Sequence, residues 1–373
     1  MQIDFIDLKS QQARIKSEID KRIADVLAHG RYVLGPEVKE LEDRLSAFAN
    51  VKHTLACASG TDAIVLVLMA WGIGPGDAVI CPSFTYCATA EAVALVGATP
   101  VLVDINRDNY NLDPQSVKQA IKDIAARSDL TLRAIMAVDL FGQSADYKTL
   151  SGIAKSEGVK LIADSAQGFG TTLDGQHPAH WADVVTTSFF PAKPLGCYGD
   201  GGAVFTNDDA MAALINSIKV HGAGTDKYDN VRLGINSRLD TLQAAILLPK
   251  LDIFADEIKT RNRIAERYKS TLKSNQVTLP TVPQNVISTW AQFCIEVADP
   301  LGLAEHLKSK GIPTARYYPK AIHMQTAYKH YPVVSSGMAN TEDASKYIIA
   351  LPMHAYLDEG TQDKISQAIL GFF

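Results

Sequence analysis

The stretch Ser188-Phe-Phe-Pro-Ala-Lys-Pro-Leu-Gly-Cys-Tyr-Gly-Asp-Gly-Gly202 places one lysine, Lys193, between an aromatic, apolar run and a chain of glycines. Glycine permits positive φ angles and close backbone approach, so the segment suits a loop that contacts a ligand. A lysine among apolar groups is easier to deprotonate, because burial disfavours the ammonium form. Most lysines beside glycine-rich loops are merely solvated, so the meaning of Lys193 depends on the rest of the chain.

Short apolar runs alternate with segments of helical spacing around this stretch. The expected strands are Ala78–Cys81, Pro100–Ile105, Arg133–Leu140, Val159–Asp164, Asp183–Phe190 and Ala203–Thr206. The expected helices between them are Ala63–Trp71, Tyr86–Val96, Pro114–Ala126 and Tyr147–Glu157. This alternation predicts an α/β fold with a mostly parallel mixed sheet between helices. Ligands of such sheets bind at the carboxyl ends of the strands.

The character of the chain changes near residue 250. A long, charged amphipathic stretch, Ala255–Lys273, leads to a proline-marked linker, Leu279–Pro283. Beyond it, Thr289–Val297 alternates like a strand, and two further segments have helical spacing, Leu301–Lys310 and Thr361–Leu370. A chain of 373 residues is long for one core. The pattern predicts a large α/β domain, residues 1–250, and a smaller C-terminal α+β domain, residues 251–373.

Composition narrows the class of partner. The net charge is −5, with acidic and basic residues interspersed and no basic block, so neither nucleic acid nor an anionic membrane is an expected partner. Five cysteines without a Cys-x-x-Cys motif suggest reduced thiols. The N-terminus lacks the pattern of a signal peptide, and no run approaches the length of a membrane span. A soluble, cytoplasmic protein with a small diffusible substrate is expected.

Asp164 ends an apolar strand at the sheet edge where a ligand would lie. Together with Lys193, it points to one particular cofactor. Pyridoxal phosphate needs a lysine that holds its aldehyde as a Schiff base and an acid that keeps its pyridine nitrogen protonated. Gln167, three residues later, is placed to hydrogen-bond the ring hydroxyl. An aspartate after an apolar strand is also a common helix cap, which is the alternative for Asp164.

Three further segments fit the same cofactor. Gly60 and Thr61 precede an apolar helix, where backbone N–H groups and the helix dipole favour a phosphate, although Ser59–Asp62 would also serve as an ordinary cap. Ser188 stands one turn of chain before Lys193, within reach of that phosphate. Phe84 follows another strand and could stack on a flat ring, although an isolated Phe is more often a core residue.

Taken together, the motifs resemble the sugar aminotransferases of the DegT/DnrJ/EryC1/StrS family. The matching segments span nearly the whole chain: Gly30–Glu37, Ser59–Asp62, Pro82–Tyr86, Asp164–Gln167, Ser188–Lys193, His221–Gly222 and Gly234–Ala245. The resemblance implies the fold type I architecture of pyridoxal-phosphate-dependent transferases. It further implies a homodimer with shared active sites.

The resemblance also implies roles for individual residues. Lys193 would be the Schiff-base lysine, Asp164 the pyridinium partner, Gln167 a ring contact, and Gly60, Thr61 and Ser188 ligands of the phosphate. Asn236 would reach the phosphate of the neighbouring subunit. Residues that match substrate-facing positions are Arg238, Tyr317, Tyr318 and His323.

The implied reaction moves an amino group from glutamate to a nucleotide-linked keto sugar. Within the family, the chain is most similar to enzymes that aminate UDP-2-acetamido-2-deoxy-3-oxo-glucuronate for surface polysaccharides such as lipopolysaccharide and its O-antigen. Tyr317 stands where those enzymes tend to have histidine, and Arg316 before it could hold a carboxylate or be an exposed strand residue. A dTDP- or UDP-linked 3-keto or 4-keto-6-deoxyhexose is the alternative substrate.

Three other functions are weighed against this one. Relatives that dehydrate sugars have histidine in place of the lysine, so Lys193 argues against a dehydratase. A non-catalytic binding protein would not need the complete set of Lys193, Asp164, Gln167 and Ser188. A metal enzyme built on His177, His180 and Asp183 is disfavoured, because two histidines in a glycine- and proline-containing loop are usually just exposed. No metal is expected.

Overall fold

A seven-stranded sheet forms the centre of the molecule, in the strand order β1-β8-β7-β5-β4-β2-β3. The computed structural model describes residues 3–226 and 228–373. Strand β8 runs antiparallel to both of its neighbours, and the other strand pairs are parallel, which confirms the predicted mostly parallel mixed sheet. The strands are β1 (His53–Cys57), β2 (Asp77–Pro82), β3 (Thr99–Val103), β4 (Thr131–Val138), β5 (Lys160–Asp164), β7 (Val184–Ser188) and β8 (Gly202–Thr206).

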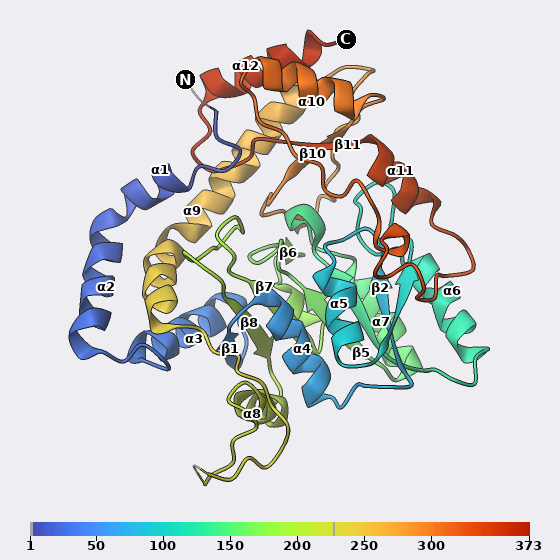
Figure 1. Cartoon of the computed structure of the whole chain (residues 1–373). Helices are drawn as coiled ribbons and strands as arrows, with labels where there is room; N and C mark the ends of the chain where they lie inside the picture. The colour runs from blue at the N-terminus through green and yellow to red at the C-terminus, as the bar shows by residue number, and fades with distance from the viewer. Residues whose placement is uncertain (1–2, 227) are drawn as a thin grey trace.

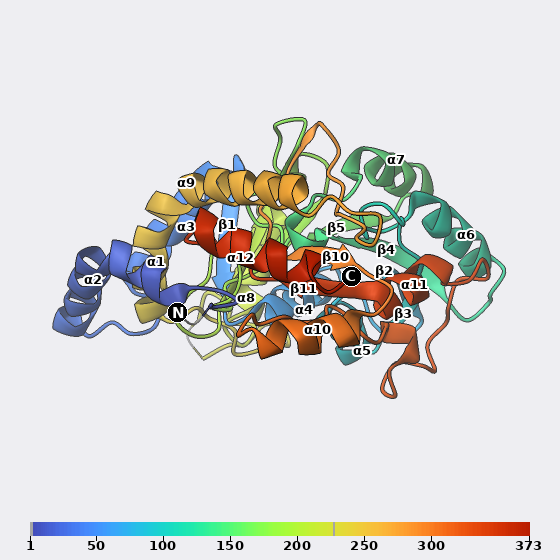
Figure 2. The ribbon, with the colours of Figure 1, turned by 90° about the horizontal axis from the view of Figure 1, so that it is seen from above.

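Helices cover both faces of this sheet. Figure 2 shows α3, α6, α7 and α9 on one side and α4, α5 and α8 on the other. Their bounds are α3 (Pro36–Ala49), α4 (Gly60–Ala70), α5 (Ala88–Leu95), α6 (Pro114–Ala125), α7 (Tyr147–Glu157), α8 (Asp209–Ile218) and α9 (Thr241–Thr271). Because both faces are covered, the strands are almost entirely buried and apolar, as parallel sheets require.

Local sequence signals explain where these helices begin and end. Asp113 precedes α6 and accepts hydrogen bonds from the N–H groups of Gln115 and Ser116, and Pro114 occupies the first helical position. Asp146 caps α7 in the same way, and Gly158 ends that helix in the left-handed conformation. The predicted helix Tyr147–Glu157 is confirmed at both ends.

The C-terminal part packs on top of the sheet layer around a second core (Figure 1). It contains the antiparallel strand pair of β10 (Phe293–Glu296) and β11 (Ile348–Leu351) with α10 (Pro300–Ser309), α11 (Ala339–Tyr347) and α12 (Glu359–Leu370). A small antiparallel pair, β6 (Thr172–Leu173) and β9 (Val286–Ile287), links it to the large sheet. Two N-terminal helices, α1 (Leu8–Arg14) and α2 (Lys16–His29), lie at one side.

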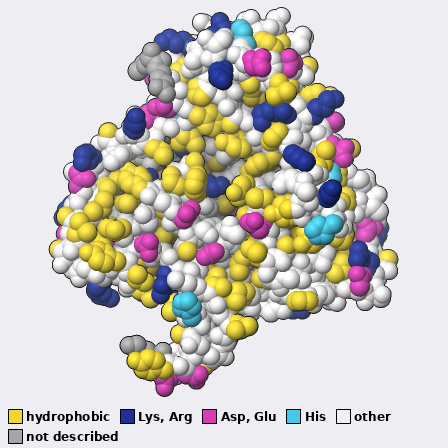
Figure 3. All heavy atoms as spheres, viewed as in Figure 1, with side chains coloured by type: hydrophobic (Ala, Val, Ile, Leu, Met, Phe, Trp, Pro, Cys, Tyr) yellow, Lys and Arg dark blue, Asp and Glu magenta, His cyan; other side chains and the backbone are white. Residues whose placement is uncertain are grey.

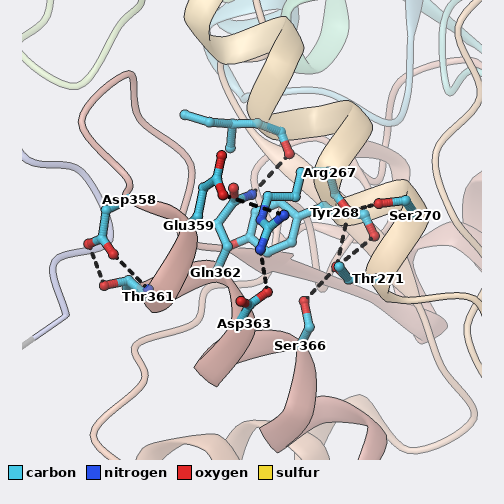
Figure 4. A network of polar contacts seen from close by, with 11 residues as sticks. Arg267, Tyr268, Ser270, Thr271, Asp358, Glu359, Thr361, Gln362, Asp363 and Ser366 are labelled. Carbon is cyan, nitrogen blue, oxygen red and sulfur yellow. Dashed lines mark hydrogen bonds and ion pairs between the residues drawn. The ribbon is translucent and has the colours of Figure 1, made fainter.

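Polar contacts fix α12 against the end of α9 (Figure 4). Arg267 of α9 forms an ion pair with Asp363, with 2.6 Å between nitrogen and oxygen. The side chain of Gln362 donates to the Ile264 carbonyl at 3.0 Å, and the hydroxyls of Thr271 and Ser366 lie 2.8 Å apart. These contacts join the C-terminal helix to the helix that emerges from the large sheet layer.

Several elements were not expected from the sequence, among them α3, α8 and β11, and two differences bear on the site and on the domain boundary. Strand β1 is not among the expected strands, because its run of apolar residues is short and its pairing with β8 is non-local. Helix α9 starts at Thr241, well before the expected amphipathic stretch, and continues through Pro249. It therefore crosses the proposed domain boundary at residue 250, which stays a prediction. Among the described residues, no helix combines the length and apolar content needed to cross a membrane.

Candidate active site

A cavity of about 360 Å³ lies at the carboxyl ends of the sheet strands. One side, called here the sheet wall, comes from residues at the ends of β1, β5 and β7 or within a few residues after them: Ser59, Gly60, Thr61, Asp164, Gln167, Ser188 and Lys193. The opposite side, called here the C-terminal wall, consists of Gln292, Tyr317 and Tyr318. Parallel strands deliver their carboxyl ends to one edge, so distant parts of the sequence meet there.

The N-terminus of α4 forms one corner of the sheet wall. The helix begins at Gly60, and the Ser59 hydroxyl caps it by accepting from the Asp62 N–H at 3.0 Å. A Cβ atom on Gly60 would lie 2.6 Å from Cβ of Ser188, and one on Gly202 would lie 2.3 Å from the Ser59 carbonyl oxygen. Both glycines are therefore required for this close approach, and the first turn of α4, where helices have N–H groups without intrahelical partners, lines the cavity.

Asp164 lies buried at the end of β5, with 5% of its surface exposed. One carboxylate oxygen accepts from the Ala166 N–H at 3.0 Å, and the other accepts from the Thr89 hydroxyl at 3.3 Å. Burial raises the pKa of Asp164, while the Ala166 hydrogen bond and the charge of Lys193 act in the opposite direction. The carboxylate is thus held in place and directed at the cavity.

A second buried carboxylate supports the turn that follows Asp164. Asp139 accepts hydrogen bonds from the Tyr147 hydroxyl at 2.8 Å, the Ala145 N–H at 3.0 Å and the Ser165 hydroxyl. Burial raises the pKa of Asp139 to about 7. Because Ser165 directly follows Asp164, this arrangement fixes the backbone that presents the cavity carboxylate.

Lys193 faces the cavity from the loop after β7. The loop is folded back on the sheet by backbone hydrogen bonds, among them Phe189 N–H to the Gly201 carbonyl at 2.7 Å and Cys197 N–H to the Phe189 carbonyl at 2.7 Å. Burial lowers the pKa of Lys193, and the nearby Asp164 carboxylate opposes this effect. The site therefore favours a neutral amine more than open solvent does.

Gln167 joins the two walls. Its amide oxygen accepts from the Phe141 N–H at 2.9 Å, and its amide nitrogen donates to the Tyr318 hydroxyl at 3.0 Å. Burial raises the pKa of Tyr318, so this phenol stays protonated over the physiological range. The pair gives the cavity a fixed polar edge between the sheet wall and the C-terminal wall.

The structure places Tyr86, rather than Phe84, at the cavity. Phe84 is fully buried and packs against Tyr110, Phe141 and Tyr318, with ring centroids 6.0 to 6.2 Å apart. Tyr86 lines the cavity and has 56% of its surface exposed. The core alternative for Phe84 therefore fits its surroundings, and the ring available for stacking belongs to Tyr86.

Four other candidate residues lie outside the cavity lining of this single chain. Asn236 is exposed and Arg238 half-buried on the loop before α9. His323 hydrogen-bonds the Ser83 hydroxyl at 2.8 Å. Arg316 donates to the carbonyls of Ser345, Lys346 and Ile348 at the end of α11. The Arg316 guanidinium thus caps the C-terminal end of α11.

Several lining residues were not among the sequence candidates, including Thr89, Tyr86 and Gln292. Thr89 belongs to α5, and Tyr86 stands two residues after Phe84, so the strand-end rule could have found both. Gln292 has no local signal, because only the packing of the β10 segment against the turn after β4 brings it to the cavity. Its backbone N–H bonds the Phe141 carbonyl at 3.4 Å.

The histidine loop lacks the arrangement of a metal site. The ring nitrogen Nδ1 of His177 accepts from the Ala179 N–H, and the Asp183 carboxylate accepts from the Leu161 N–H. Within residues 3–226 and 228–373, no group of three or more His, Cys, Asp or Glu side chains is placed to hold a metal ion.

The polar groups of the sheet wall match the parts of pyridoxal phosphate. Free N–H groups at a crowded glycine pair suit its phosphate, a buried carboxylate suits its ring nitrogen, and a buried lysine suits its aldehyde. The residues present therefore fit this cofactor, which requires all three kinds of group in one cavity.

Comparisons with known proteins agree with this fit. The sequence model of the DegT/DnrJ/EryC1/StrS aminotransferase family matches residues 13–370. A UDP-2-acetamido-2-deoxy-3-oxo-D-glucuronate aminotransferase of Pseudomonas aeruginosa is 48% identical over 98% of this chain and 99% of its own.

Two solved structures are similar over nearly the whole chain. A DegT DnrJ EryC1 StrS aminotransferase from Brucella abortus is 50% identical, with a TM-score of 0.97 over 99% of both chains. The NtdA protein of Bacillus subtilis, solved with the cofactor PMP bound, is 29% identical, with a TM-score of 0.88 over 99% of this chain and 83% of its own. PMP is the aminated form of pyridoxal phosphate.

Proposed function

This chain belongs to the DegT/DnrJ/EryC1/StrS aminotransferase family, and we propose that it aminates C3 of a UDP-linked 2-acetamido-2-deoxy-3-oxo-hexuronate with glutamate as donor. It is a nucleotide-sugar aminotransferase, and its cofactor is pyridoxal phosphate. The choice of sugar rests on the full-length similarity to the Pseudomonas enzyme. The observation that carries the assignment is the meeting of Lys193, Asp164 and the α4 N-terminus in one cavity.

The sheet wall would hold the cofactor through four kinds of contact. The N–H groups of Gly60 and Thr61 and the hydroxyl of Ser188 would bind the phosphate. Asp164 would pair with the ring nitrogen, and Gln167 would contact the ring hydroxyl. When bound, the cofactor carries the amino group between the two substrates and accepts electrons from the reacting carbon.

Lys193 would move the proton in both halves of the reaction. Because burial lowers its pKa, its free amine can take a proton from the carbon that gives up nitrogen. The same group, once protonated, can return a proton to the carbon that gains nitrogen. Asp164, fixed by Ala166 and Thr89, would keep the ring nitrogen protonated during both steps.

Tyr86 would stack on the cofactor ring in place of Phe84. Its exposed ring stands at the cavity edge, whereas the ring of Phe84 is enclosed by other aromatic side chains. Phe84 would then act indirectly, because it packs against Tyr318 of the C-terminal wall.

A homodimer would complete the site. Exposed large hydrophobic side chains occur at the cavity, beside the start of α9 and on the segment before α9: Tyr32, Val33, Leu34, Tyr86, Phe190, Val231 and Leu233. Figure 3 shows hydrophobic side chains spread over the face around the central hollow. Such surface is typical of an interface. Asn236 and Arg238, outside the cavity of their own chain, would serve the partner's phosphate and substrate, and His323 would contribute near Ser83.

The proposal also covers where the reaction takes place and what becomes of its product. Five free cysteines fit a reducing compartment, so we place the reaction in the cytoplasm. The amino sugar would enter synthesis of a surface polysaccharide such as lipopolysaccharide or O-antigen. A dTDP- or UDP-linked 3-keto or 4-keto-6-deoxyhexose is the alternative acceptor, and dehydration is disfavoured by the presence of Lys193.

The visible spectrum of the purified protein tests this proposal. Glutamate should bleach the cofactor band, and the correct keto sugar from a panel of UDP- and dTDP-linked sugars should restore it. Restoration by a UDP-linked 3-keto-hexuronate alone would support the stated substrate, whereas restoration by a dTDP sugar would favour the alternative. A band that glutamate leaves unchanged would contradict aminotransferase activity.

A further inference from the structure

Gln292 carries an unused acceptor at the cavity. Its side-chain oxygen Oε1 is buried and has no hydrogen-bond partner among the residues that the structure describes. The residue lines the same cavity as Lys193, Tyr317 and Tyr318. Since buried polar atoms are nearly always satisfied, an orphan acceptor inside a ligand cavity indicates a ligand group that donates to it.

The backbone around Gln292 is held firmly. The Thr289 N–H donates to the Gly142 carbonyl at 2.9 Å, and the Thr289 hydroxyl donates to the Gln167 carbonyl at 3.2 Å. The Trp290 indole donates to Asn262 at 3.1 Å. The orphan oxygen therefore belongs to a fixed segment, and a ligand that bonds it gains a preorganised partner.

Several other polar groups of this region already have partners. Gln167 is bonded to Phe141 and Tyr318, Arg316 closes α11, and His323 bonds Ser83. Gln292 thus offers a buried acceptor in this region that is left for a ligand. Its oxygen can bind an N–H or O–H donor and cannot bind a carboxylate or a ketone oxygen.

We propose that Gln292 recognises the 2-acetamido group of the nucleotide sugar by accepting its amide N–H. This inference rests on the proposed function. The reacting carbon C3 must reach Lys193, so the substituent on the adjacent C2 has to lie in the same small cavity. A carboxamide presents an acceptor and a donor side by side, as an acetamido group does, so the two amides can pair reciprocally.

The test separates the two halves of the reaction. Wild type, Gln292→Leu and Gln292→Met are compared on two UDP-linked 3-keto sugars, one with acetamido and one with hydrogen at C2. Gln143→Leu is the matched control, because Gln143 is a buried glutamine outside the cavity lining. Cofactor affinity and the rate of bleaching by glutamate are measured for every variant.

We expect kcat/KM for the acetamido sugar to fall by about 10- to 100-fold in both Gln292 variants, because a partner of a substrate N–H is lost. The 2-deoxy sugar should change by less than about threefold, and bleaching by glutamate and cofactor affinity should stay unchanged. Equal losses on both sugars, no loss on either, or slower bleaching would overturn the role of Gln292. A wild type that bleaches with glutamate but aminates neither sugar would instead contradict the proposed substrate.

Discussion

The two walls of the cavity differ in how their polar groups are satisfied. On the sheet wall, Ser59 caps α4, Asp164 accepts two hydrogen bonds, and the Lys193 loop is bonded back onto the sheet. On the C-terminal wall, Gln292 keeps a buried oxygen without a partner. A wall whose side chains are fixed suits a resident cofactor, whereas a wall with an unpaired side-chain acceptor suits a substrate that binds and leaves.

The difference follows from the fold. Residues of the sheet wall stand at the ends of strands, where the parallel topology fixes both position and direction. Residues of the C-terminal wall stand on loops, and packing of the β10 segment on the turn after β4 places them. Changes in the sheet wall should therefore abolish the reaction, and changes in the C-terminal wall should alter which sugar reacts.

The largest expected effect comes from removal of the lysine side chain of the sheet wall. Lys193→Ala should lower turnover on the order of 10⁴-fold or more, because the proton-transfer group is removed. Lys250→Met is the control: Lys250 is also buried, with its pKa lowered to about 8, but it bonds the Gly196 carbonyl outside the cavity lining. Steady-state assays with glutamate compare the two. Comparable turnover in both variants would remove Lys193 from its role.

A smaller loss is expected when the sheet wall keeps its shape but loses its charge. Asp164→Asn should lower turnover by about 10²- to 10³-fold and change the visible spectrum of the bound cofactor, because the ring nitrogen loses its anionic partner. Asp104→Asn provides a second buried carboxylate, which caps α11 through Asn340 and Thr341. That control should lower stability and leave the spectrum unchanged. An unaltered spectrum in Asp164→Asn would show that another group protonates the ring.

The close contact between Gly60 and Ser188 allows a test of whether the N-terminus of α4 binds the cofactor phosphate. Gly60→Ala should weaken cofactor affinity about tenfold or more, since its Cβ would meet Ser188 at 2.6 Å. Gly152→Ala, inside α7 with open space around its Cβ, should leave affinity unchanged and raise the free energy of unfolding by about 0.5–1 kcal/mol. Cofactor titration and urea unfolding measure both. Equal affinities in Gly60→Ala and wild type would argue against a phosphate at this corner.

The smallest effect on the reaction is expected from a group outside both walls. Burial and the charge of Arg261 lower the pKa of His354 from 6.5 to about 4. The unfolded chain therefore binds a proton below pH 6.5 that the folded chain refuses until about pH 4, so stability falls as pH drops through that window. His177, whose pKa burial also lowers to about 4, acts in the same direction.

His354→Gln should reduce the loss in free energy of unfolding between pH 7 and 4 by up to about 3 kcal/mol. The sugar preference should stay unchanged. Urea unfolding at several pH values measures the slope. An unchanged slope in the variant would show that His354 is protonated in the folded protein as readily as in the unfolded chain.

The sequence indicated residues of both walls: strand and helix patterns pointed to the sheet wall, and the family resemblance named Tyr317 and Tyr318 of the C-terminal wall. Apolar runs located six of the seven strands of the large sheet within two residues, and strand ends then named Asp164 and Ser188. The α4 N-terminus was named from its capping sequence, Ser59–Asp62, because β1 was not expected. The same rule selected Phe84 instead of Tyr86, because alternation along an irregular strand end does not reveal which ring points to the cavity. The position of Gln292 at the cavity and the hydrogen bonds from Arg316 to the end of α11 could not be predicted, since both depend on contacts between segments far apart in the chain.

Transfer of labelled nitrogen tests the central claim most directly. The protein is incubated with [¹⁵N]glutamate and the UDP-linked 2-acetamido-2-deoxy-3-oxo-hexuronate, and the sugar is examined by mass spectrometry and NMR. An aminotransferase with this substrate will yield a sugar that carries ¹⁵N bonded to C3. A sugar that contains no ¹⁵N, or that has lost oxygen without gaining nitrogen, would contradict the account.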